Sequence, residues 1–556
     1  MSSRVSLVIE DNVVKSCVEG TAIPDVDFVT YFTNVWRQYE DLVALVDVKT
    51  DVQYTFGELL DACRRVSAGL RRLGLRKGDV VAVHCANGTE LVVAMCGTFF
   101  AGAVAALIKT SLAEGETRYE LADSEAKFVF CDIELKEKIK NACDGLPSVE
   151  MIVVTTGPSD DGAHSLSELK LSPLEDNEVS LKPSVHTVLT VLYSSGSTGL
   201  PKGVQLTHRN VIAQVVSFGF LDPLVFERGD VFLPMTPILH VGGFSLFFGY
   251  IGHGCKVVLV PAPNYDVVLP AIQKHRPTML GLLPTLIQKL DQHPLIGEVD
   301  TRSVKKLVTG GSTSSSRVLE NIARRLGLKG VTQVYGMTEL TGCITYSIPR
   351  EDDFKSVGTP APFVEMRVVD VCTRKALGPH EQGEICVKGA CTFKGYLKNP
   401  NETADAYEDG FVRTGDVGYY TPDGRFYVCG RLKELIKCMD EQVAPAELEE
   451  LLAADPGVRH AVVVGVPHPE YGEAARAFVV HRRRLQTGSL EEQREAQRLQ
   501  ELVAAHLAYH KHLHGGIEFL EIIPNTASGK DRRNALRDGY IYQQSCREKI
   551  PEVDKN

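Results

Sequence analysis

Short apolar runs alternate with helical patterns through most of the chain. The runs have the length and the β-branched content of buried strands, and Leu59–Leu73 has the spacing of an amphipathic helix. The predicted strands are Val80–His84, Lys127–Cys131, Met151–Thr155, Thr187–Tyr193, Lys256–Leu259, Thr278–Gly281 and Lys305–Thr309. A Gly/Ser loop follows the strand Thr187–Tyr193, and a helix is predicted over His208–Phe218. This alternation predicts an α/β fold with two doubly wound, mostly parallel sheets that carry helices on both faces.

The pattern changes near Phe354 to closely spaced strands and turns. Strands over Met366–Asp370 and Gly383–Lys388, with a turn at Pro422-Asp423-Gly424, predict a β-rich lobe that ends near Gly430. After the charged RLKE stretch, a small α+β domain is predicted from helices over Ala446–Ala454 and Leu490–His506 and strands over Ala461–Val466 and Ala475–His481. The second of these helices is polar and is expected to be solvated. We therefore expect a large domain over 1–430, a hinge over 431–433 and a small, mobile domain over 434–556.

One segment requires a membrane test. Leu91–Ile108 contains 18 residues without a charge, which is the lower limit for a spanning helix. The segment is rich in alanine and is interrupted by Gly97 and Gly102. We therefore predict a buried helix that ends near Gly102, followed by a strand over Ala103–Ile108, and no membrane span.

Composition excludes several classes of protein. A chain of 556 residues requires more than one hydrophobic core. Its 60 Lys and Arg against 71 Asp and Glu give a net charge of −11, so we expect no broad basic surface for nucleic acid, and any nucleotide must be held locally. The 14 cysteines are scattered, without a C-x-x-C pair, as is typical of free thiols in a reducing compartment. The N-terminus lacks a secretory apolar run and the C-terminus lacks a peroxisomal tripeptide, which favours a cytoplasmic location over a peroxisomal one.

The segment Tyr193–Val204 is dense in groups that bind phosphate. It combines hydroxyl donors, glycines that let the backbone approach an anion, and one lysine. The hydroxyls come from Ser194, Ser195, Ser197 and Thr198, the glycines are Gly196, Gly199 and Gly203, and the lysine is Lys202. Pro201-Lys202-Gly203 differs from the Walker pattern, which places Ser or Thr after the lysine. The segment is predicted to be a polyphosphate loop; a flexible linker is the alternative.

This loop resembles the phosphate-binding signature of the acyl-adenylate-forming superfamily, which contains acyl-CoA synthetases, coumarate:CoA ligases, beetle luciferases and peptide-synthetase adenylation domains. Further motifs of that family follow in its order across roughly Tyr54 to Arg533. The resemblance implies an enzyme that binds ATP, Mg²⁺ and CoA together with a small carboxylic acid.

Several nucleotide-binding roles follow from the resemblance. Gly310-Gly311-Ser312-Thr313 is similar to the adenine-side loop, although the family usually has small residues and proline where Ser312 and Thr313 stand. The stretch from Gln333 to Glu339 matches the family's nucleotide motif. Its implied roles are Tyr335 and Gly336 beside the adenine, Thr338 as a phosphate donor, and Glu339 as the Mg²⁺ ligand. Asp416 is implied to accept the ribose hydroxyls, and a turn aspartate is the plain alternative.

The remaining implied residues belong to the acyl pocket and the mobile domain. His240 stands in a segment that resembles the acyl-pocket motif, where a satisfied core histidine is the alternative. Arg431 is implied to reach the ribose or phosphate and Lys433 to act as the pivot. Lys530, on a Ser-Gly turn, is implied to bridge the carboxylate and the α-phosphate. Lys437 and Gln442 complete the motif that follows the hinge.

One departure affects the CoA-side surface. Most acyl-CoA ligases of the family continue after the lysine matched by Lys437 with an aromatic residue, lysine and glycine, whereas this chain reads Cys438-Met439-Asp440. Asp440 adds negative charge where a phosphorylated thiol would approach, and we expect the lack of glycine to disfavour a turn with positive φ.

The resemblance implies attack of a carboxylate on the α-phosphorus of ATP, followed by thioester formation with CoA. Three alternatives stay open: a luciferase-like oxygenation of the same adenylate, the loading of a carrier protein, and a non-catalytic nucleotide-binding scaffold. The segments around His240–Ser245, Gly310–Thr313 and Gly336–Thr345 are expected to line the acyl pocket. Their composition suits an aromatic, a medium-chain or a longer acid.

Overall fold

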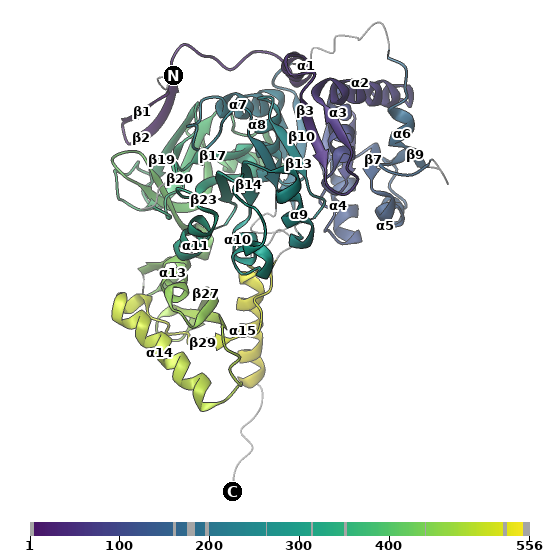
Figure 1. Cartoon of the computed structure of the whole chain (residues 1–556). Helices are drawn as coiled ribbons and strands as arrows, with labels where there is room; N and C mark the ends of the chain where they lie inside the picture. Colours follow the sequence, from purple (N-terminus) through teal and green to yellow (C-terminus); the bar gives the residue numbers. More distant parts are fainter. Residues whose placement is uncertain are drawn as a thin grey trace.

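The computed structural model describes residues 5–158, 163–174, 184–194, 200–262, 264–312, 315–349, 353–439, 441–525 and 531–548. Over these residues the strands form four sheets (Figure 1). Three sheets belong to the large N-terminal part of the chain, and the fourth belongs to the C-terminal part.

The first sheet has the order β21-β11-β10-β6-β5-β7-β8-β9, and β10 through β9 run parallel. Its strands are β5 (Val80–His84), β6 (Val104–Leu107), β7 (Phe128–Cys131), β8 (Met151–Val154), β9 (Ala163–Ser165), β10 (Val188–Ser194), β11 (Lys202–Thr207) and β21 (Gly395–Tyr396). The antiparallel strands β11 and β21 close one edge.

The second sheet has the order β18-β17-β16-β15-β14-β12-β13-β3-β4, with a parallel centre and antiparallel edges. Its strands are β3 (Val43–Asp47), β4 (Gln53–Thr55), β12 (Val231–Pro234), β13 (Lys256–Leu259), β14 (Met279–Leu282), β15 (Lys306–Gly310), β16 (Thr332–Met337), β17 (Gly342–Tyr346) and β18 (Thr359–Pro360). The prediction of two mostly parallel sheets is therefore confirmed. The chain does not complete one sheet before it begins the other. The strand β3 belongs to the second sheet, whereas later strands such as β10 belong to the first.

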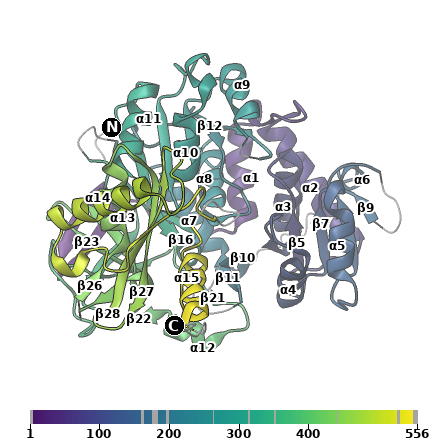
Figure 2. The same ribbon diagram turned by 90° about the horizontal axis from the view of Figure 1, so that it is seen from below.

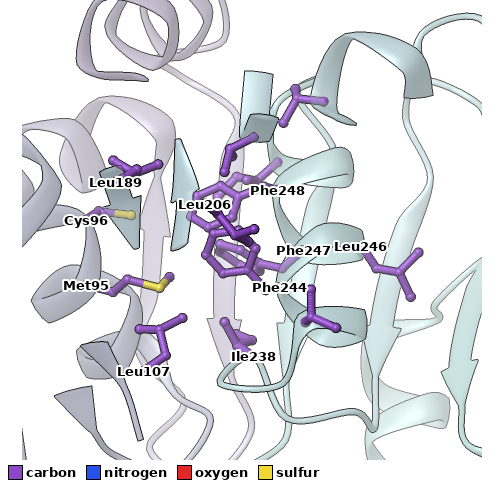
Figure 3. Packing of buried hydrophobic residues seen from close by; sticks show 14 of the residues in the cluster. Met95, Cys96, Leu107, Leu189, Leu206, Ile238, Phe244, Leu246, Phe247 and Phe248 are labelled. Atoms are coloured by element: carbon purple, nitrogen blue, oxygen red, sulfur yellow. The ribbon is translucent and has the colours of Figure 1, made fainter. Parts of the chain in front are cut away.

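Helices cover these sheets, and α8 lies between them. The helices of the large part are α1 (Phe28–Gln38), α2 (Phe56–Arg72), α3 (Thr89–Phe100), α4 (Glu114–Ser124), α5 (Lys136–Cys143), α6 (Leu166–Leu169), α7 (His208–Phe218), α8 (Val241–Ile251), α9 (Tyr265–His275), α10 (Pro284–Asp291), α11 (Ser316–Leu326) and α12 (Pro400–Asp405). In Figure 3 the rings of Phe244, Phe247 and Phe248 on α8 lie near Leu189 and Leu206 of the first sheet. This packing fixes the N-terminus of α8, where His240 is the N-cap residue.

The uncharged segment is the buried helix α3 followed by β6, as predicted, and its helical residues are buried. Within the described residues, no helix combines the length and apolar character needed to cross a membrane.

The β-rich lobe contains one element that the sequence pattern did not assign to it. Its order is β1-β2-β19-β20-β23-β22, with β24 beside β23. Its strands are β1 (Val5–Glu10), β2 (Val13–Val18), β19 (Val364–Val369), β20 (Gly383–Gly389), β22 (Tyr407–Glu408), β23 (Phe411–Tyr420) and β24 (Phe426–Arg431). The predicted lobe after Phe354 is confirmed, and the N-terminal hairpin β1–β2 extends it by pairing with β19.

The phosphate loop joins two antiparallel strands. We predicted a strand, a loop and then a helix, but Lys202–Thr207 forms β11, which pairs with β10 from Ser194↔Lys202 onward. The alternation of buried Val204 and Leu206 with the less buried Gln205 is a strand pattern, which the adjacent glycine and lysine obscured.

The C-terminal part forms the order β26-β25-β28-β27, with β29 beside β28. Its elements are β25 (Ile436–Cys438), β26 (Glu441–Val443), β27 (Val458–His468), β28 (Gly472–His481), β29 (Ile517–Phe519), α13 (Pro445–Ala454), α14 (Leu490–His506) and α15 (Arg533–Glu548). Along the polar helix α14 only Leu499 and Val503 are buried, as expected. Within the described residues, its hydrophobic clusters contain residues from Ile436 onward, whereas the clusters of the other sheets contain no residue beyond Val428. The predicted hinge lies in the interval between them.

Candidate active site

The phosphate-loop strands bring three polar residues onto one face. They are the predicted Ser194 and Lys202 and the neighbouring Tyr396. Ser194 pairs with Lys202 across β10 and β11, and Val204 pairs with Tyr396 across β11 and β21. Because strand side chains alternate, Lys202 and Val204 share a face, and Tyr396 shares it as a cross-strand neighbour. Residues 195–199, which include the predicted Ser195, Gly196, Ser197, Thr198 and Gly199, lie outside the described residues.

Glu339 faces this group from the turn that follows β16. Its side-chain Oε1 accepts a hydrogen bond of 3.2 Å from Ser194 Oγ and one of 2.9 Å from Tyr396 Oη. Glu339 is only 6% exposed, and no Lys, Arg or His of the described residues forms an ion pair with it. A buried carboxylate without a cationic partner is costly, and carboxylate oxygen is a ligand type that Mg²⁺ accepts. The donor set therefore fits the metal that we expected at Glu339.

Lys202 already has a partner in the described structure. Its ammonium forms an ion pair with Glu402 of α12 and lies 5.3 Å from the centre of the Tyr396 ring. The positive charge therefore lies beside the phosphate-loop strands, between an acid and an aromatic face.

A second polar group is centred on Asp416 of β23. Tyr335 Oη donates to Asp416 Oδ2 at 2.8 Å, and Arg431 Nε lies 2.8 Å from Asp416 Oδ1. Asp416 and Arg431 are opposite each other in the β23–β24 register, which explains the pairing. Burial and the charge of Asp416 raise the pKa of Tyr335, so its hydroxyl stays a donor at neutral pH. Burial lowers the pKa of Arg431, but the charge of Asp416 together with smaller contributions from neighbouring groups outweighs it, and the net shift is upward.

A cavity that is partly open to solvent lies between α8 and the ends of β14, β15 and β16. All three segments that we expected around the acyl group contribute to its lining. They supply His240, Val241 and Gly242, then Gly310 and Gly311, and then Gly336, Gly342 and Cys343. The sequence reasoning missed the rest of the lining, which consists of Thr236, Leu246, Gly281, Leu282, Leu283, Val308, Thr309 and Val334. No charged side chain is part of this lining.

His240 lies at the N-terminus of α8 and borders the cavity. Its Nδ1 accepts a hydrogen bond from Gly242 N at 3.2 Å, which caps the helix. The ring therefore has a structural role and a position beside the cavity.

Glycine at 336 is required by the backbone. A Cβ on this residue would overlap the backbone oxygen of Gly342 on the adjacent strand β17. The close approach of β16 and β17 lets the segment from Tyr335 to Glu339 run from Asp416, past the cavity, to Ser194.

Other predicted residues are placed less directly. Gln333 uses its side-chain amide to donate to the carbonyls of Phe354 and Ser356, at 2.8 and 3.2 Å. Ser312, Lys433 and Lys437 are exposed, and Thr338 is partly buried in the turn before Leu340. Residues Thr313, Asp440 and Lys530 and the side chain of Gln442 lie outside the described residues.

The position where the family has glycine corresponds to Asp440, which lies outside the described residues, so the expectation that the lack of glycine disfavours a positive φ stays a prediction. The residue before it, Met439, adopts a φ of 56° after β25. The pairing of Cys438 with Glu441 forces a tight reversal, which places Met439 in the left-handed region.

Comparison with known proteins tests the resemblance directly. The family model described as "AMP-binding enzyme" matches residues 32–397, and the model of the AMP-binding enzyme C-terminal domain matches residues 447–530. The chain belongs to the AMP-binding, acyl-adenylate-forming superfamily. The predicted membership is therefore confirmed.

Relatives in this superfamily cover nearly the whole chain. The 4-coumarate–CoA ligase 3 of Arabidopsis thaliana is 32% identical over 537 residues, covering 93% of this chain and 92% of its own. The luciferin 4-monooxygenase of Photinus pyralis is 32% identical over 513 residues, covering 90% and 91%. The solved o-succinylbenzoate CoA synthetase of Bacillus subtilis, in complex with its acyl-adenylate intermediate, is 28% identical with a TM-score of 0.77 and covers 91% of this chain and 98% of its own. The chain thus resembles CoA ligases and luciferases to a similar degree.

Proposed function

We propose that the protein is an AMP-forming acid:CoA ligase, which activates a carboxylic acid with ATP and transfers the acyl group to CoA. The observation that carries this proposal is the segment from Tyr335 to Glu339. Its first residue contacts Asp416, its second lines the uncharged cavity, and its last contacts the phosphate-loop strand through Ser194. One short segment therefore connects the proposed ribose, acyl and phosphate ends of a single site.

In the first half-reaction, a carboxylate oxygen of the acid attacks the α-phosphorus of ATP. The bond between the α-phosphorus and the bridging oxygen breaks, pyrophosphate leaves and an acyl-adenylate forms. Two anions must meet, so the protein contributes position and positive charge. We assign this work to Lys202, the hydroxyls of Ser194 and Thr338, and Lys530 from the small domain.

Glu339 would hold Mg²⁺, which neutralises phosphate charge during the transfer. Asp416 would accept the ribose hydroxyls while Arg431 stays within reach of the same oxygens. Tyr335 and the loop from Gly310 to Ser312 would border the adenine. The cavity would take an acyl group without a charge, because a charged tail would lack a partner there.

In the second half-reaction, the CoA sulfur attacks the acyl carbon, the carbon–oxygen bond to AMP breaks, and AMP leaves. We propose that the small domain rotates about Lys433 so that Lys437 and Gln442 face the adenylate. In this stretch the sequence has no glycine where the family usually has one, and Asp440 adds a carboxylate. Thioester formation is consequently the step that needs the most direct test.

The test is an acid panel with ATP and Mg²⁺, run with and without CoA. Pyrophosphate release reports the first half-reaction, and acyl-CoA measured by mass spectrometry reports the second. We expect both signals from an acid whose acyl group carries no charge apart from the reacting carboxylate, with pyrophosphate release reduced at least 100-fold by Glu339→Gln and by Lys530→Ala. Lys274→Ala is the matched control, because Lys274 is exposed and pairs only with a surface acid among its described contacts.

Any other result of this test would indicate a different activity of the protein. Pyrophosphate release that CoA leaves unchanged, without acyl-CoA across the panel, would indicate another acceptor, and light emission with a luciferin would identify oxygenation. Absence of pyrophosphate release with every acid would contradict the proposal and favour the scaffold.

A further inference from the structure

The segment Gly395–Asp405, which we name the strap, lies against the phosphate-loop strands. It consists of β21, a turn and α12. Leu397 N donates to Gly203 O at 2.7 Å, and Tyr396 N donates to Thr403 Oγ1 at 2.9 Å. Asn399 caps α12 by accepting from Glu402 N. These bonds hold Tyr396 and Glu402 in fixed positions beside Lys202.

Glu402 gives Lys202 a negative partner within the protein. Their ion pair is partly buried, with side-chain exposures of 22% for Lys202 and 40% for Glu402. Glu402 Oε2 is itself shielded from solvent and has no hydrogen-bond partner besides this ion pair among the described residues. A phosphate that binds Lys202 must therefore compete with the carboxylate of Glu402.

Tyr396 joins the same group to Glu339. Its ring lies beside the Lys202 ammonium, and its hydroxyl donates to Glu339 Oε1. Burial, followed by the charge of Glu339, raises the pKa of Tyr396, so the hydroxyl remains a donor. Tyr396 and Ser194 both bond Oε1, which fixes the orientation of the Glu339 carboxylate.

We propose that the strap sets the charge and geometry of the phosphate end, with Glu402 as the resting partner that the triphosphate displaces from Lys202 and Tyr396 as the residue that positions Glu339. This inference rests on the proposed function, because it assumes that ATP binds at Lys202. It adds two positioning residues that lie outside the phosphate loop and outside the segment from Tyr335 to Glu339.

The first test measures ATP binding by calorimetry without Mg²⁺ at low salt. Removing the competing charge with Glu402→Gln is expected to lower the Kd for ATP about two- to fivefold, because an ion pair of this exposure is a modest competitor. In a Lys202→Ala background the same substitution should have no effect on the Kd. Glu320→Gln, at an exposed acid paired with Arg324 on α11, is the matched control.

The second test measures the Mg²⁺ dependence of pyrophosphate release. Tyr396→Phe removes one donor from Glu339 and keeps the ring, so we expect the Mg²⁺ concentration for half-maximal rate to shift about tenfold. The KM for the acid should not change. A merely structural role of Tyr396 would instead lower kcat and thermal stability without moving the Mg²⁺ curve.

The two proposals fail differently. A wild-type protein that binds no ATP would remove the proposed function. A wild-type protein that binds ATP, with a Glu402→Gln variant that binds it equally or more weakly, would overturn the role of Glu402. An unchanged Mg²⁺ curve in Tyr396→Phe would overturn the role of Tyr396.

Discussion

At the scale of single residues, Gly336 has the tightest backbone environment in the candidate site. A methyl group there would overlap the Gly342 oxygen and push β16 away from β17. We expect Gly336→Ala to lower the free energy of unfolding by about 1–3 kcal/mol and to reduce pyrophosphate release more than this loss explains. Urea unfolding and the acid-dependent assay measure the two effects. Gly297→Ala is the control, since a Cβ at that exposed glycine meets nothing within 4 Å; an active Gly336→Ala variant would contradict the assignment.

His208 gives a residue-scale prediction about pH. It is buried at the start of α7, and its Nδ1 accepts from Phe28 N at 3.1 Å, which joins α7 to α1. Burial lowers the pKa of His208 from 6.5 to about 4. Between these values the unfolded chain binds a proton that the folded chain does not, so stability present above pH 6.5 is lost as the pH falls toward 4.

We expect the free energy of unfolding to fall by about 2 kcal/mol through His208 between pH 7 and pH 5. His208→Gln should flatten this dependence, whatever its effect at pH 7. Chemical unfolding at both pH values measures it, with the exposed His186→Gln as the control. An unaltered pH slope in His208→Gln would show that other groups, such as the buried His84, account for the loss.

At the scale of elements, local patterns determined what the sequence could predict. The boundaries of β5, α7, β13 and α14 agree with the predictions, because each has a clear apolar period and a recognisable start. The strand β11 was missed because glycine and lysine at its start dominate the local pattern. The pairing of β1–β2 with β19 was missed because local patterns do not encode distant strand partners.

The candidate site followed the same rule. Motif residues such as Glu339, Asp416 and Arg431 were identified by resemblance, and the structure brings the last two together. Tyr396 and Glu402 were missed, although an aromatic residue and an acid near a Pro-Asn turn are visible in the sequence. Their relevance depends on the pairing of β21 with β11, which only the fold supplies.

The β25–β26 hairpin carries an element-scale prediction. Met439 has a φ of 56°, a conformation in which glycine avoids a penalty of roughly 1 kcal/mol that other residues incur. Met439→Gly should therefore leave stability unchanged or raise it by up to about 1 kcal/mol, after the loss of partial side-chain packing. Glu441→Gly, at an exposed position of the neighbouring strand β26, is the control and should destabilise. Thermal unfolding that shows a clear loss for Met439→Gly would mean that the Met439 side chain outweighs the strain.

At the scale of the whole molecule, the two parts of the chain meet through polar contacts. Lys355 and Ser316 both contact Glu450 of α13, at 3.0 and 3.2 Å, and Gln288 of α10 donates to Arg459 O. Asp531 pairs with His460, the neighbour of Arg459, so the residues just before α15 lie on this side of the small domain. Figure 1 shows α15 starting near α10 and running away from it, and Figure 2 shows the small domain from below. This arrangement places Asp531, which directly follows the segment that contains Lys530, on the side of the small domain that faces the large part.

Because these contacts are polar and at least partly exposed, they can break without unfolding either part. Glu450→Lys would repel Lys355 and remove the acceptor for Ser316, which destabilises this arrangement relative to a rotated one. We expect pyrophosphate release in a single turnover to slow several-fold, while acyl-CoA formation from a supplied acyl-adenylate keeps its rate and the melting temperature stays constant. Glu501→Lys on α14 carries the same charge change away from the contact and should alter neither rate. Equal slowing of both half-reactions by Glu450→Lys would mean that this contact supports the site in both arrangements, and domain rotation would then have to be argued from other residues.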